Sequence, residues 1–181
     1  IGFIGAGKVG MTLGKYFTLH GITVSGYYSP HHAQDAAEFT QTKAFDSIEA
    51  LAAESDALFL TVPDGMITTV YQTLPVDTVK GKIICHCSGA LSAEAAFPGI
   101  DSVGAYGYSV HPLFSVSDPY RSYRELSDAF FCIEGEGPHL EMWEGILKKI
   151  GGGVQVIDAD VKAKYHAACA ISSNLICALV Y

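Results

Sequence analysis

A glycine-rich stretch near the start of the chain constrains the fold more than any other part of the sequence. It reads Gly-Phe-Ile-Gly-Ala-Gly-Lys-Val-Gly and contains a Gly-x-Gly-x-x-Gly pattern at Gly5, Gly7 and Gly10, between the apolar run Ile1–Ile4 and the helix-like segment Lys8–His20. These glycines permit, in turn, a tight strand-to-helix turn, close approach of the backbone to a pyrophosphate, and close packing of helix on strand. A helix N-terminus also attracts phosphate. The stretch therefore predicts a dinucleotide-binding unit, and a glycine turn that binds nothing is the alternative.

The rest of the chain alternates short apolar runs with helix-like segments, which is typical of a parallel sheet covered by helices on both faces. The run Asp56–Val62 is almost continuously apolar, as expected of a strand buried on both sides. We expect an α/β fold, with a Rossmann-type, doubly wound and mostly parallel sheet over residues 1–157. The first long helix of an all-α C-terminal domain is expected over 158–181. The other expected strands are Ile22–Tyr28, Thr42–Phe45, Lys82–Cys87, Ser102–Val110, Ala129–Glu134 and Val154–Ile157.

The net charge of the chain and the distribution of its acidic residues limit which kinds of ligand it can bind. The net charge of −8 argues against a nucleic-acid partner. No Asp or Glu occurs from Ile1 to Gln34, while Lys8 and Lys15 lie in that segment. Acidic groups are therefore missing from the segment that would meet a phosphorylated ligand, unless they are missing by chance.

The cysteines and the longest apolar run bear on the cellular setting. The five cysteines follow no metal-binding spacing, so no metal site is expected, and their apolar surroundings indicate reduced, buried thiols in a cytoplasmic protein. They are Cys85, Cys87, Cys132, Cys169 and Cys177. No signal-peptide pattern is visible. The run Ala167–Tyr181 is too short to span a bilayer and contains polar residues, so we expect a buried helix and no membrane partner.

The end of the second strand bears on which nicotinamide cofactor binds. NAD-specific fingerprints carry Asp or Glu there to bind the ribose 2′-hydroxyl. This chain instead has Tyr28 or Ser29, followed by Pro30, His31 and His32. A hydroxyl and imidazoles accept a 2′-phosphate that a carboxylate would repel, so the sequence favours NADP, with NAD as the alternative. No Arg accompanies them, and the two histidines could equally form a solvated turn.

Ligands of open α/β sheets bind beyond the carboxyl ends of the strands. The residues predicted to contact the cofactor lie there: Gly5, Ala6, Gly7, Lys8, Val9, Gly10, Ser29, His31, His32, Val62, Pro63 and Ser88.

Further motifs give the chain a recognisable resemblance. They are Thr61-Val-Pro-Asp64, His86-Cys-Ser-Gly-Ala-Leu91, His111-Pro-Leu-Phe114, Lys162-Ala-Lys-Tyr-His-Ala-Ala168 and Ser173-Asn174. With the glycine motif, they resemble the superfamily of β-hydroxyacid dehydrogenases, pyrroline-5-carboxylate reductase and prephenate dehydrogenase. The chain is most similar to a subgroup of predicted NADP-linked or deazaflavin-linked oxidoreductases. The resemblance implies a Rossmann domain, a helical C-terminal domain that often mediates homodimerisation, and deazaflavin as an alternative co-substrate.

The resemblance also implies catalytic roles. Ser88 and His111 match residues that contact the substrate hydroxyl at the nicotinamide end of prephenate dehydrogenases, where a His of near-neutral pKa can exchange the hydroxyl proton. The alternatives are a turn-forming hydroxyl for Ser88 and a backbone-bonded loop residue for His111. His86 is expected to point into the core.

In β-hydroxyacid dehydrogenases a Lys, with an Asn four residues later, lies on the helix after the Rossmann domain. Here Lys162 is followed by His166, one helical turn on, and Ser173 and Asn174 continue the polar stripe. Such a stripe on an apolar helix needs a ligand or partner side chains. Lys162 and His166 are therefore predicted to be catalytic and Asn174 to bind substrate, with interhelix hydrogen bonding as the alternative. Lys164 is expected in solvent.

The two arginines of the chain, Arg121 and Arg124, could bind a carboxylate of the substrate or form a solvated loop face. Asp64 is expected to cap a helix. Together these features favour an NADP-dependent oxidoreductase that moves hydride to or from a small polar substrate, which could carry a carboxylate. A prephenate dehydrogenase-like enzyme and a non-catalytic NADP-binding regulatory protein are the alternatives.

Overall fold

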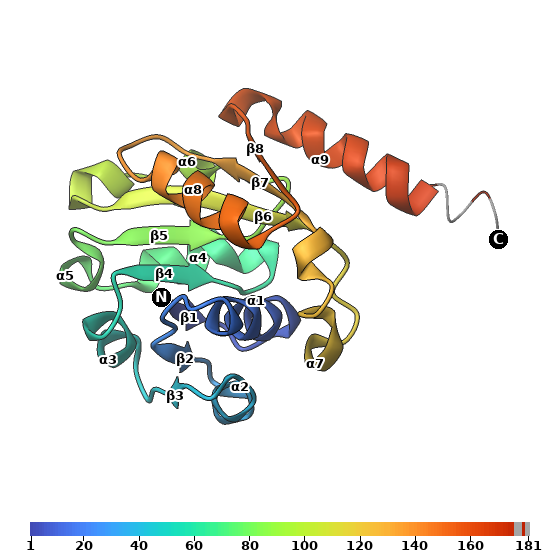
Figure 1. The fold of residues 1–181 in the computed structure, drawn as a ribbon. Coiled ribbons are helices and arrows are strands. Elements are labelled where there is room, and N and C mark those ends of the chain that lie inside the picture. Colours follow the sequence, from blue (N-terminus) through green and yellow to red (C-terminus); the bar gives the residue numbers. More distant parts are fainter. Residues whose placement is uncertain (176–178, 180–181) are drawn as a thin grey trace.

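The structure is a computed structural model that describes residues 1–175 and residue 179. Its centre is an eight-stranded sheet in the order β3-β2-β1-β4-β5-β6-β7-β8 (Figure 1). All neighbouring pairs are parallel except β6 and β7. The expected Rossmann-type, mostly parallel sheet is confirmed. The strands are β1 (Gly2–Ile4), β2 (Gly26–Tyr28), β3 (Lys43–Ala44), β4 (Ala57–Leu60), β5 (Ile83–His86), β6 (Tyr106–Leu113), β7 (Phe130–Glu134) and β8 (Gly153–Val156).

Helices cover both faces of the sheet. They are α1 (Lys8–Leu19), α2 (Ala33–Thr40), α3 (Ile48–Ala53), α4 (Ile67–Thr73), α5 (Val76–Val79), α6 (Ala93–Ala96), α7 (Pro119–Ser122), α8 (Leu140–Ile150) and α9 (Lys162–Ala170). Short 3₁₀ turns lie at Asp64–Met66, Ile100–Val103, Leu126–Asp128 and Ala159–Val161. The connection after β6 contains a helical turn, α7.

The alternation of side chains along the strands produces two separate cores. Phe3 and Phe59 point to one face, where they pack with Phe17 of α1 and Trp143 of α8. Neighbouring residues such as Ile4 point to the other face, toward α3, α4, α5 and α6. Each central strand is buried on both sides, which explains its nearly continuous apolar sequence.

Strand β6 is longer than the sequence suggested. It was expected to end before His111, but its antiparallel pairing with β7 continues to Leu113, and His111 lies opposite Cys132. The prediction that His111 follows the strand is therefore wrong. The antiparallel neighbour supplies backbone partners that a parallel strand ending at the common edge would not.

The C-terminal segment also differs from the single regular helix that was expected from Ala159 onward. A 3₁₀ turn precedes α9, and a π-helix follows at Ile171–Leu175. There the Ser173 hydroxyl donates to the Cys169 carbonyl at 2.8 Å, the acceptor that the Ser173 amide would use in an α-helix. Cys177 and the end of the predicted helix lie outside the described residues.

Burial of this helix was also expected, and α9 does not show it. Lys162 is its one buried side chain, and Ile171 beyond it is 58% exposed. Figure 1 shows α9 leading away from the sheet. Within the described residues, no helix is both long enough and apolar enough to cross a bilayer.

Candidate functional site

The glycine loop between β1 and α1 is shaped by close backbone contacts with the end of β4. Gly5 has a positive φ of 109°, and a Cβ there would lie 2.7 Å from the Thr61 carbonyl oxygen. A Cβ on Gly10 would lie 2.5 Å from Thr61 Oγ1. Both positions therefore need glycine. Gly7 is exposed and would meet nothing nearer than 3.9 Å.

The N-terminus of α1 fits a phosphate group. Gly7 is its N-cap, so no side chain caps the helix, and its first turn holds no acid. The approach to the amides is open because Gly7 has no side chain. The predicted Ala6 is buried, Lys8 is exposed and Val9 is half-buried.

The predicted cofactor residues after β2 and β4 lie beside this loop. The Gly5 amide donates to the Tyr28 carbonyl at 2.8 Å, and the Thr61 amide donates to the Ile4 carbonyl at 2.9 Å. The strand ends that precede Ser29 and Val62 therefore adjoin the glycine loop.

These residues differ in their exposure. His31, His32 and Pro63 are exposed, while Ser29 and Val62 are half-buried. His32 Nδ1 lies 3.3 Å from an Asp35 carboxylate oxygen, so the first acid of the chain sits beside the predicted 2′-phosphate residues.

A buried lysine lies further along the sheet. Lys162, the first residue of α9, is fully buried, and its Nζ donates to Ser109 Oγ of β6 at 2.6 Å. Burial lowers the pKa of Lys162, and the negative charge of Glu134 opposes that shift. Burial likewise raises the pKa of Glu134, whose carboxylate accepts the Ala93 amide at 2.8 Å. An amine whose pKa is lowered gives up its proton more readily than a lysine in water.

His111 and His166 meet at Gly89. A Cβ on Gly89 would lie 2.9 Å from His111 Nε2 and closer still to His166 Nδ1, a buried nitrogen without a hydrogen-bond partner in the described structure. The two imidazole centroids are 5.9 Å apart. On its other side, His111 Nδ1 lies 3.2 Å from the Tyr165 hydroxyl.

His111 is a neutral imidazole at pH 7. Burial, and then the positive charges of Lys162 and His166, lower its pKa to about 4, against a smaller opposite effect of Asp64. The expected near-neutral pKa of His111 is therefore wrong, because the sequence did not reveal how deeply β7 and α9 bury the ring. A neutral imidazole serves as a hydrogen-bond donor or acceptor.

Ser88 is held by its own turn. Its hydroxyl donates to an Asp64 carboxylate oxygen at 2.6 Å and accepts the Ala90 and Leu91 amides at 3.3 Å and 3.1 Å. The Ser88 proton is thus engaged by Asp64. Asp64 does not cap a helix, so that prediction is wrong. His86 is fully buried, as expected, and accepts the Ser88 amide at 3.1 Å.

The side chains around Lys162 form a cluster with Ser109, His111, Tyr165 and His166. No described contact joins the predicted substrate-binding arginines to this cluster. Arg121 lies 3.6 Å from Asp118, and Arg124 donates to the Tyr123 hydroxyl at 3.2 Å. The helix that carries Arg121, α7, packs on α1. The Asn174 side chain lies outside what the structure describes. Lys164 is exposed, as expected.

Two cluster members were given no role in the sequence analysis: Ser109 and Tyr165. Tyr165 could have been found, because it lies three residues after Lys162 and so shares its helix face with Lys162 and His166. Ser109 carries no such signal, since its role depends on the register between β5 and β6.

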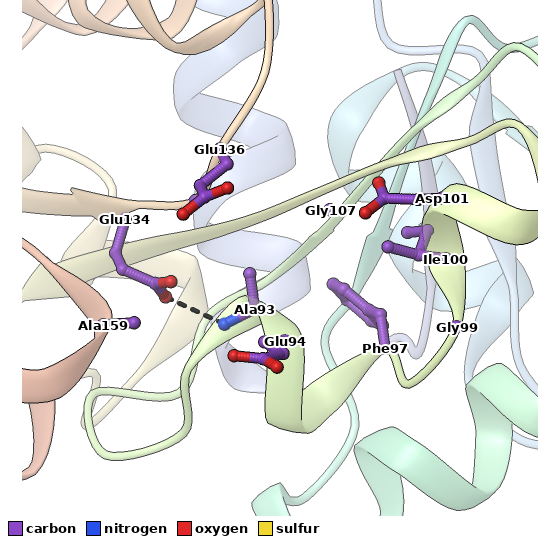
Figure 2. A pocket seen from close by; sticks show the side chains of 11 residues that line it. Ala93, Glu94, Phe97, Gly99, Ile100, Asp101, Gly107, Glu134, Glu136 and Ala159 are labelled. Carbon is purple, nitrogen blue, oxygen red and sulfur yellow. Dashed lines mark hydrogen bonds between the residues drawn. The ribbon is translucent and has the colours of Figure 1, made fainter.

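A separate acidic hollow of about 370 Å³ lies over α6 and the ends of β6 and β7. Figure 2 shows Glu134 and Glu136 on one side of it and Asp101 on the other. Glu134 connects this hollow to the cluster, because its charge acts on Lys162.

Comparison with known proteins shows the family to which the chain belongs. The chain belongs to the Rossmann-like domain family, whose model matches residues 1–112. Residues 129–181 match a second family, described as a domain of unknown function (DUF2520). No match was found among curated proteins. The first match and the solved structures described next confirm the Rossmann-like fold that the motifs predicted.

Among solved structures, protein TM1727 from Thermotoga maritima is 29% identical with a TM-score of 0.75, over 99% of this chain and 66% of that one. The imine reductase from Myxococcus stipitatus in complex with NADP⁺ is 15% identical with a TM-score of 0.79, over 98% and 63%. Its V8 variant, in complex with NAD⁺, is 16% identical with a TM-score of 0.76, over 99% and 61%. At such identities the imine reductases show a shared fold. The chain spans about two thirds of the length of these proteins.

Proposed function

We propose that this chain is the cofactor-binding part of an NADP-dependent oxidoreductase that transfers hydride to or from a small polar substrate. One observation carries the proposal. The open glycine loop adjoins the ends of β1 and β4, and the cluster of buried Lys162 with half-buried His111 and His166 gathers where β5 ends and along β6, so both lie beside the carboxyl ends of strands of the same sheet. Rossmann sheets bind dinucleotides across this edge. The solved imine reductases that share the fold, described with NADP⁺ and with NAD⁺, support the same cofactor class.

The residues divide into two functional groups. Gly5–Gly10 and the N-terminus of α1 would hold the pyrophosphate, and Ser29, His31 and His32 would receive the 2′-phosphate. NADP, when bound, supplies or accepts the hydride. Lys162 would hold the proton that accompanies it, at an Nζ already shielded from water and anchored on Ser109. Ser88 would shape the turn that brings Gly89 against the two imidazoles.

Substrate and assembly belong to the same proposal. Arg121, Arg124 and Asn174 are assigned to a carboxylate-bearing substrate, on the ground of their chemistry alone. Residues 158–181 are assigned to the start of a helical domain through which the protein forms a homodimer. Light scattering of the full-length protein tests this, and a monomer at micromolar concentration would contradict it.

A thermal-shift comparison of NADPH, NADH and a reduced deazaflavin tests the cofactor. A ligand at about one hundred times its dissociation constant adds roughly 2.7 kcal/mol of stability. NADPH is expected to stabilise the protein at lower concentration than NADH does. Failure of all three ligands to stabilise it would refute cofactor binding, and a deazaflavin response alone would reassign the cofactor.

Substitution at the end of β2 tests the choice between NADP and NAD. A carboxylate in Ser29→Asp is expected to weaken NADPH binding about tenfold relative to NADH, which corresponds to about 1.4 kcal/mol. If His31 and His32 bind the 2′-phosphate, the double variant His31→Gln/His32→Gln should weaken NADPH binding more than NADH binding. Equal responses would remove the histidines from the site.

A further inference from the structure

Tyr165 contacts the one imidazole nitrogen of His111 that faces away from Gly89. Its hydroxyl lies 3.2 Å from His111 Nδ1, and the two rings meet edge to face at 5.9 Å and 83°. Tyr165 lies on α9, in the same helical turn as Lys162 and His166. A hydrogen bond at one ring nitrogen decides which tautomer a neutral imidazole adopts.

The direction of this hydrogen bond follows from the acceptors around the hydroxyl. Burial raises the pKa of Tyr165 far above its usual range, so the hydroxyl keeps its single proton. The groups that interact with it are His111 Nδ1 and the thiols of Cys132 and Cys169. Sulfur is a weak acceptor, whereas an imidazole nitrogen is a strong one. The hydroxyl therefore donates to Nδ1.

With Nδ1 accepting, the proton of the neutral His111 ring sits on Nε2. Both this nitrogen and His166 Nδ1 lie against Gly89. We propose that Tyr165 is a positioning residue that fixes His111 as the Nε2–H tautomer and so presents a hydrogen-bond donor beside Gly89. The role of this donor in catalysis rests on the proposed oxidoreductase function, whereas the assignment of the tautomer does not.

The proposal separates the roles of two cluster residues. His111 would donate a hydrogen bond from Nε2 to the oxygen or nitrogen of the substrate at the reacting carbon, without giving up its proton. Lys162 would exchange the proton itself. Tyr165 would act only through His111, because its hydroxyl is directed to Nδ1.

Nitrogen-15 NMR of the full-length protein, labelled at histidine, tests the tautomer directly. His111 is expected to show an unprotonated Nδ1 and a protonated Nε2. Two histidines serve as internal standards. His20 Nδ1 lies 2.8 Å from the Tyr16 carbonyl, so it must carry a proton, whereas His86 Nδ1 accepts the Ser88 amide and must not. A His111 spectrum that resembles that of His20 overturns the proposal.

The variant Tyr165→Phe removes the hydroxyl and keeps the ring. His111 is then expected to lose its preference for the Nε2–H tautomer, and kcat to fall about tenfold or more while the KM for NADPH is unchanged. Tyr106→Phe, at the start of the strand that carries His111, is the matched control and is expected to change neither. A His111 tautomer unchanged in Tyr165→Phe overturns the proposal, even if kcat falls. If the His111 tautomer depends on Tyr165 but the protein binds no nicotinamide cofactor, the tautomer assignment stands and the proposed function is refuted.

Discussion

The glycine loop and the cluster of Lys162, His111 and His166 lie beside the same sheet and are built in opposite ways. The loop presents backbone amides, is open at Gly7, and contains no acid in the first turn of its helix. The cluster presents side chains from β6 and α9, and burial shifts the pKa of both Lys162 and His111. A loop made of backbone binds charge on a ligand at little cost in desolvation. A cluster made of buried titratable groups changes proton affinities, which is what proton transfer needs.

Because of this contrast, the loop and the cluster tolerate different amino-acid substitutions. In the loop, an added methyl group at Gly5 or Gly10 collides with fixed backbone. In the cluster, removal of one charged group leaves its partners buried and unpaired. Mutations should therefore separate cofactor binding from turnover.

The largest expected effect is on turnover. Lys162→Met keeps the length of the side chain but removes the proton-exchanging amine, so kcat should fall by about 10²–10⁴ while NADPH affinity stays the same. Lys164→Met, exposed two residues later on the same helix, is the matched control and should be silent. Steady-state kinetics and NADPH titration of both variants measure this. Equal kcat in Lys162→Met and the wild type would remove Lys162 from the mechanism.

The pH dependence of stability is the next largest effect. The pKa of His111 is about 4 in the folded protein and is near 6.5 when unfolded, so the unfolded state binds more protons between these values. Stability should therefore fall as the pH drops from about 6.5 to 4, with a His111 contribution of at most about 3 kcal/mol. His86, with a pKa of about 3, adds loss of the same sign.

Denaturant unfolding of wild type and His111→Gln across this range isolates the His111 contribution. The variant should lose less stability on acidification. Glu134, whose pKa is raised by burial, contributes with the opposite sign in both proteins and cancels in the comparison. His31→Gln, at an exposed site, is the control. Identical slopes for His111→Gln and wild type would mean that His111 is not desolvated.

Within the loop, two alanine substitutions should behave differently. Gly5→Ala forces a side chain into a positive φ and against the Thr61 carbonyl, and should cost about 1–3 kcal/mol of folding free energy. Gly7→Ala meets nothing nearer than 3.9 Å, so it should fold normally and lose NADPH affinity because the methyl group covers the phosphate approach. Thermal unfolding and NADPH titration distinguish the two. A Gly7→Ala variant that binds NADPH normally would argue against pyrophosphate at this loop.

The loop could be predicted from the sequence and the cluster only partly, for the same physical reason. Gly5, Gly7 and Gly10 are neighbours in the chain, and their roles follow from local backbone geometry. His111 and Lys162 lie far apart in the chain, and the electrostatic interaction between them depends on how far β6 pairs with β7 and where α9 begins. The residue types of His111 and Lys162 were enough to predict catalytic roles for them. The buried state of each, the Asp64–Ser88 hydrogen bond and the part played by Tyr165 depend on packing that no local pattern encodes.

The smallest expected effect concerns Arg121 and Arg124, which belong to neither region. The Arg121–Asp118 pair is 3.6 Å apart and its side chains are 82% and 45% exposed, so Arg121→Ala should change stability by less than about 0.5 kcal/mol. If these arginines form only a solvated loop face, the double variant Arg121→Ala/Arg124→Ala should leave the substrate KM unchanged as well. A tenfold rise in KM at constant kcat would instead assign them to a carboxylate of the substrate. The site would then have a third, exposed part that binds substrate, and the contrast between loop and cluster would no longer account for all of its chemistry.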